Sequence, residues 1–130
     1  MGELLTDHIF GTGLACMKTA LEDFFSWVDL LVDWHKEPHQ SPLHHLGNLR
    51  RILSQTNDFH SRDQERLEAS SLELAESEHL LRRYRGTPPS FVTFCAATSR
   101  RHLQESIVHT LQKRQHFMAD EIQHLEEAID

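Results

Sequence analysis

The residues that interrupt helices are concentrated at two places in this 130-residue chain. All four prolines lie there: Pro38 and Pro42 in the first place, Pro88 and Pro89 beside Gly86 in the second. Proline lacks a backbone donor and glycine favours turns, so both residue types end helices. The chain has only five glycines, which leaves little material for other turns. The sequence therefore predicts three long segments, over about residues 4–35, 42–85 and 90–129.

Apolar residues in the first segment recur at alternating spacings of four and three, which indicates one face of an α-helix. This face consists of Phe10, Leu14, Met17, Leu21, Phe24, Val28, Leu31 and His35. Other apolar residues lie on both flanks and widen the apolar arc to about 200°, more than a surface helix needs. We therefore predict that packing leaves part of the arc uncovered, and that Trp27, Leu30 and Trp34 bind a partner or a second copy.

The two later segments are also amphipathic. The second keeps one helical register from Leu46 to Tyr84. The third places seven apolar residues on one face, with Phe91, Val92, Phe94 and Cys95 packing near its start; the seven are Leu103, Ile107, Leu111, Met118, Ile122, Leu125 and Ile129. No alternating pattern indicates a strand. The predicted fold is all-α, an antiparallel bundle of three long helices in a single domain, residues 1–130.

One alternative has four helices. The second segment is polar between Thr56 and Asp63, and the run 61–64 resembles a capping box, the start signal of a new helix. A break near residue 58 would then divide the segment. The additional helix would cover Trp27, Leu30 and Trp34 and leave no interface.

The order of these segments resembles that of a spectrin-type three-helix repeat. The resemblance lies in the Leu21–Val28 run, with Trp27 among its apolar residues, and in the leucine-lined second segment. It implies scaffolding or adaptor work and supplies no site residues.

Charge and cysteine usage narrow the class of protein. The formal net charge of −7 opposes binding to the phosphate backbone of nucleic acids. Cys16 and Cys95 lie in apolar runs without metal-ligand spacing, which is typical of reduced thiols. No signal sequence or membrane-spanning run is recognisable, since the stretch from Phe24 to Val32 is short and contains Asp29. We therefore expect a cytoplasmic protein.

No motif for catalysis is recognisable. The sequence lacks a nucleophile elbow and a phosphate-binding loop, so we predict no enzyme activity, no catalytic residues and no cofactor. Two Glu-x-x-His motifs, at 76–79 and 121–124, have the spacing of metal ligands in helical bundles. The first falls opposite the leucines of its helix, so we predict no metal ligands. The alternative function is a histidine-rich metal-binding bundle, because His102, His109 and His116 share one stripe.

Two further groups are candidates for interactions. Five arginines flank the second turn and suggest an acidic partner or anionic lipid, unless they only complement a helix dipole: Arg82, Arg83, Arg85, Arg100 and Arg101. His60 lies on the apolar face of the second segment, one turn before Asp63. We expect Asp63 to be the hydrogen-bond partner of His60.

Overall fold

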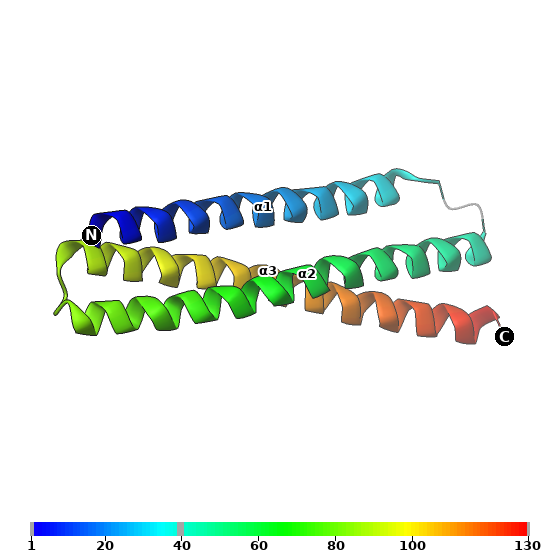
Figure 1. Ribbon diagram of the computed structural model, residues 1–130. Coiled ribbons are helices and arrows are strands. Elements are labelled where there is room, and N and C mark those ends of the chain that lie inside the picture. The colour runs from blue at the N-terminus through cyan, green and yellow to red at the C-terminus, as the bar shows by residue number, and fades with distance from the viewer. Residues whose placement is uncertain (1, 39–40, 130) are drawn as a thin grey trace.

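The computed structural model is a bundle of three long helices, α1 (Gly2–Lys36), α2 (Pro42–Arg83) and α3 (Pro88–Ile129). It describes the backbone of residues 2–38 and 41–129, and the side chains of residues 17–38 and 41–129. No strand occurs in the described backbone. α1 and α3 run in one direction and α2 in the other, so the start of α1 lies at the same end as the α2–α3 turn (Figure 1). The predicted three-helix architecture is confirmed.

The ends of α2 are set by local hydrogen bonds. At its start, Ser41 is the N-cap and its hydroxyl accepts the backbone N–H of His44 at 3.1 Å, with Pro42 in the first turn. At its end, Gly86 N donates to Leu81 O at 2.9 Å and Arg85 N donates to Arg82 O at 3.3 Å. These two bonds form a Schellman motif, which satisfies the last carbonyls of the helix.

α2 is one continuous helix, so the four-helix alternative with a break near residue 58 is wrong. The polar residues that suggested a break have partners instead. Thr56 donates to Ile52 O at 2.8 Å and accepts the indole N–H of Trp27 at 3.0 Å. Asp63 is bonded to side chains of α2 and α3. Because these groups are satisfied, the helix continues through them.

The hydrophobic core lies in the half of the bundle nearest the α1–α2 connection. All three helices contribute to it: Ala20, Trp27, Leu31, Trp34, Leu49, Ile52, Ile107, Leu111 and Met118. Towards the α2–α3 turn the buried positions of α2 and α3 are small or polar, namely Ser77, Ser90, Thr93, Ala97, Arg100 and Gln104, while the α1 side chains at this end lie outside the described residues. The prediction that Phe91, Val92 and Cys95 pack inward at the start of α3 is wrong. All three are exposed.

Candidate functional site

The predicted partner-binding residues do not form an exposed face. Trp27 is 2% exposed and Trp34 is 6% exposed, and both belong to the core. Leu30 is half-buried in a shallow groove beside Phe59 of α2. The expectation that packing would leave the two tryptophans uncovered is therefore wrong. Partner binding through these three residues stays an untested prediction, although in this structure only Leu30 remains partly accessible.

The two tryptophans turn inward because α2 supplies partners for both. The indole N–H of Trp27 reaches the hydroxyl of Thr56, and the ring of Trp34 stacks on His45 with centroids 5.7 Å apart and planes at 13°. Each ring also removes roughly 200 Å² from water, more than any aliphatic side chain. Because burial of the two tryptophans is favourable, the side of α1 that faces the core differs from the predicted one. The difference is a rotation of roughly 60° about the helix axis, at about 100° per residue. Of the predicted face, Phe10 and Leu14 lie outside the residues whose side chains are described.

The rotation leaves a second apolar row on the outside of α1. Phe25 is 60% exposed and Val32 is 42% exposed, while Leu21 and Val28 are half-buried. These four residues, here called the outer stripe, are spaced by four, three and four positions. They therefore share one side of the helix. From Leu21 to Val32 the stripe is about 17 Å long, which is three helical turns.

α3 adds an exposed aromatic ring to the same side of the bundle. Leu103 of α3 and Met17 of α1 line one cavity, so this side of α3 faces α1. Phe117 follows Leu103 by 14 residues, which places it within about 40° of Leu103 around the helix. Its ring is 53% exposed and lies 5.7 Å from the guanidinium carbon of Arg114. The outer stripe and Phe117 are therefore the two apolar borders of one face.

Charges of opposite sign border this face. Asp29 and Asp33 are exposed on α1, beyond the outer stripe as seen from α3. Lys113 and Arg114 stand beside Phe117 on α3, and together with it they line a shallow hollow. A ligand that fits this face must be apolar where it meets the outer stripe and Phe117, basic where it meets Asp29 and Asp33, and acidic where it meets Lys113 and Arg114.

A buried polar network joins the three helices near the middle of the bundle. Arg66 of α2 donates to Asp23 of α1 at 2.5 Å and to Asp63 of its own helix at 2.9 Å. Gln104 of α3 donates to the same Asp63 carboxylate at 2.8 Å. Asp63 is almost completely buried. The network therefore fixes how the three helices align along the bundle.

The protonation of Arg66 follows from its partners. Burial by itself lowers the pKa of the guanidinium, but the hydrogen bonds and charges of Asp23 and Asp63 outweigh burial and raise the pKa above its ordinary value. A raised pKa in the folded state stabilises the fold at every pH below the ordinary value. That contribution is lost only as the pH rises through the raised pKa. The cation of Arg66 is therefore permanent under physiological conditions.

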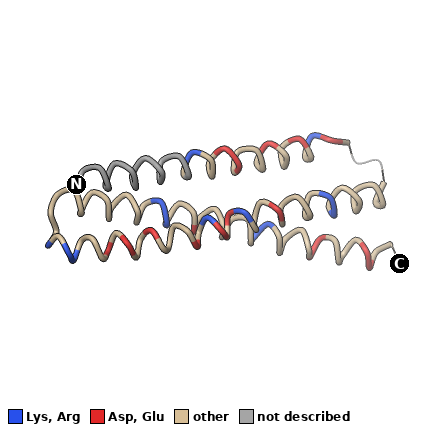
Figure 2. The backbone as a smooth tube through the Cα atoms, in the orientation of Figure 1, with Lys and Arg blue, Asp and Glu red and all other residues tan. Residues whose placement is uncertain are grey.

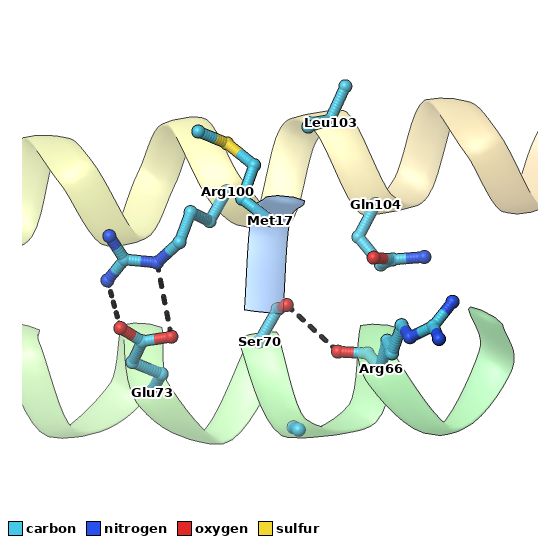
Figure 3. Close-up of a pocket in the computed structure, with 8 residues that line it drawn as sticks. Met17, Arg66, Ser70, Glu73, Arg100, Leu103 and Gln104 are labelled. Atoms are coloured by element: carbon cyan, nitrogen blue, oxygen red, sulfur yellow. Dashed lines mark hydrogen bonds and ion pairs between the residues drawn. The ribbon is translucent and has the colours of Figure 1, made fainter. Parts of the chain in front are cut away.

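The network borders a small cavity between the helices. The cavity has a volume of about 70 Å³, and Arg66, Arg100, Glu73 and Gln104 line it together with Met17, Ala69, Ser70 and Leu103 (Figure 3). Arg100 forms an ion pair with Glu73 in its wall. Ligand sites are usually several times larger, and both arginines here already have carboxylate partners. The cavity is suited to water and to structural ion pairs.

The predicted acidic-partner cluster is divided in the structure. Arg82, Arg83 and Arg85 are exposed at the α2–α3 turn. Arg100 is buried against Glu73. Glu73 precedes Arg82 by nine residues, which is about 13 Å along α2. Arg101 pairs with Glu105 at 3.0 Å and donates to Ser71 at 3.2 Å. The inclusion of Arg100 in an accessible cluster was therefore wrong, and the accessible charge at the turn comes from the first three arginines.

His60 lacks its expected partner, and the histidines that share a stripe on α3 lie at the surface. Asp63 pairs with Arg66 and Gln104, so its expected bond to His60 is wrong. The Nε2 atom of His60 is buried and has no hydrogen-bond partner among the described residues. Glu76 and His79 are exposed, as are His102, His109 and His116. In residues 17–38 and 41–129, no three potential histidine, cysteine, aspartate or glutamate ligands lie close enough together to hold a metal ion.

Comparison with protein-family models, characterised proteins and solved structures found no match. The similarity to spectrin-type repeats therefore extends only to the three-helix architecture. Within the described part of the chain, no helix has an apolar run long enough to cross a bilayer. The structure is a three-helix bundle with a hydrophobic core near the α1–α2 connection, a polar network near its middle and exposed apolar residues on α1 and α3.

Proposed function

We propose that this chain is a non-enzymatic interaction module that binds an amphipathic helix along the outer stripe of α1. The observation that carries the proposal is the second apolar row, Leu21, Phe25, Val28 and Val32. After the first row has formed the core, Phe25 and Val32 remain exposed and Leu21 and Val28 are only half-buried. Isolated exposed apolar residues are common on protein surfaces, whereas a row at helical spacing is the pattern by which helices dock on one another. The three-helix architecture of spectrin-type scaffolds fits the same role.

The residues along this face indicate which side chains a partner helix would carry. Its helix needs an apolar seam of about three turns to match the roughly 17 Å stripe. Basic side chains on one edge would meet Asp29 and Asp33, and acidic side chains on the other would meet Lys113 and Arg114. A contact along this stripe would bury less surface than the roughly 800 Å² per partner that a stable interface buries. The proposed binding is therefore reversible, as in an adaptor.

Site-directed photo-crosslinking tests this proposal. A photoreactive phenylalanine analogue at position 25 is expected to crosslink a helical partner in cell extract, and the mass of the product shows whether the partner is a second copy. Introducing Val32→Asp is expected to weaken binding by about tenfold or more, because a charge then lies in the apolar seam. Leu72→Asp is the matched control, since Leu72 is an equally apolar exposed residue on α2.

Three results would contradict the proposal. One is the absence of a crosslink at position 25. Another is the same products from the analogue at position 72, which would indicate nonspecific adhesion. The third is equal loss of the crosslink in Val32→Asp and Leu72→Asp, with helicity by circular dichroism unchanged in both variants.

A further inference from the structure

The α2–α3 turn carries an unbalanced positive charge. Between His79 and Gln104 the sequence contains no aspartate or glutamate, although the whole chain has a net charge of −7. Arg82, Arg83 and Arg85 are exposed, and none of them forms an ion pair with the described side chains. Figure 2 shows Lys or Arg positions, in blue, at the α2–α3 turn end of the helical hairpin. The α2–α3 turn itself is therefore locally cationic.

Exposed apolar residues surround the same turn. Tyr84 is 44% exposed, Phe91 is 55% exposed and Val92 is 54% exposed. Phe91 and Val92 are consecutive, so they point about 100° apart around α3. A partner on one side of α3 would need a contact at least about 100° wide to cover both. A surface that receives the end of the hairpin as a whole would cover both.

The backbone at this turn holds an arginine where glycine is usual. Arg85 occupies the left-handed position after the helix, with φ of 51°. This position of the Schellman motif favours glycine, because a side chain there is strained. An arginine at this position is less stable than glycine, and it adds a positive charge to the turn.

From these three observations we propose that this end of the molecule, the basic tip, docks on an anionic lipid bilayer. The basic tip consists of Arg82, Arg83, Tyr84, Arg85, Phe91 and Val92. Arginines near such a surface are attracted by its negative potential, while tyrosine and phenylalanine side chains settle at the level of the headgroups. A fluid bilayer can contact all sides of a projecting end, whereas an acidic protein would need these residues on one continuous face in order to contact them together.

The net negative charge of the chain does not prevent this docking. Electrostatic interactions are screened over about 8 Å at physiological ionic strength. The helices are about 60 Å long, so most acidic residues lie several screening lengths from the tip. Glu78 is the nearest acidic residue along α2, one turn before Arg82, and no ion pair joins the two. The local charge of the three arginines therefore dominates at the bilayer.

Co-sedimentation with lipid vesicles tests the proposal. The full chain is expected to sediment with vesicles of phosphatidylcholine and phosphatidylserine, and to remain in solution with phosphatidylcholine alone. Each arginine near an anionic surface contributes roughly fivefold to partitioning, so replacing Arg82, Arg83 and Arg85 by glutamine is expected to weaken it on the order of 100-fold. The control replaces Lys18, Lys36 and Arg51 by glutamine. It changes the net charge equally but lies away from the tip, and binding should be nearly unchanged.

Arg85→Gly separates binding from folding. It removes one charge and relieves the left-handed strain, so vesicle binding is expected to fall about fivefold while Tm rises by about 3 °C. Wild-type protein that stays in solution with anionic vesicles would overturn the proposal and leave an acidic protein as the alternative occupant. Equal binding to both kinds of vesicle, or equal loss in the control triple variant, would also overturn it.

Discussion

Replacing Trp27 by alanine is expected to lower the free energy of unfolding by about 4 kcal/mol, because it opens a large cavity where all three helices meet. The substitution also removes the donor to Thr56, whose hydroxyl retains its bond to Ile52 O. Urea denaturation, followed by the far-ultraviolet circular dichroism signal of the helices, measures the change in the free energy of unfolding.

Two control variants separate the orientation of α1 from its general apolarity. Phe25→Ala removes an exposed ring from the same helix and is expected to change stability by no more than about 0.5 kcal/mol. Trp27→Phe keeps most of the apolar volume and loses the hydrogen bond, at a cost of about 1 kcal/mol. Similar losses in Trp27→Ala and Phe25→Ala would mean that α1 is rotated differently from this structure.

Replacing Asp63 by alanine is expected to destabilise the bundle by about 3 kcal/mol, since removing one member of a buried ion pair leaves the other uncompensated. The estimate is at the lower end of the usual range because Arg66 keeps its bond to Asp23. Gln104 also loses its side-chain acceptor. Chemical denaturation of Asp63→Ala and of the exposed-site control Glu65→Ala measures the difference.

A double-mutant cycle of Asp63→Ala with Arg66→Ala isolates the interaction between the two side chains. The losses of unfolding free energy in the two single variants are expected to add up to more than the loss in the double variant. The reason is that each single variant leaves a charge without one of its partners. If Asp63→Ala is no more destabilising than Glu65→Ala, the network does not hold the helices together.

Much of the fold was predictable from local signals. The four prolines and Gly86 marked both connections, and the register of the leucines predicted the inner face of α2. These features act within a few residues, so one sequence is enough to interpret them. The continuity of α2 through Thr56 and Asp63 was harder to predict, because the partners of these polar groups are 29 and 41 residues away in sequence.

The sequence did not predict the orientation of α1, because the row that contains Trp27 and Trp34 faces the core. Two apolar rows of α1 lie next to each other, and periodicity alone does not say which row faces the core. The choice depends on Thr56 and His45 of α2, which receive Trp27 and Trp34. The size of the tryptophans was the available signal, since the largest apolar side chains gain most from burial.

Tryptophan fluorescence tests the central claim, that α1 turns its tryptophans inward and presents the outer stripe. Trp27 and Trp34 are the only two tryptophans in the chain, so the emission reports on this side of α1 alone. For the monomer at low concentration we predict a blue-shifted emission maximum and strong protection from acrylamide quenching. A red-shifted maximum with quenching as free as that of urea-unfolded protein would contradict the account, because the tryptophans would then be the exposed row and Phe25 and Val32 the buried one.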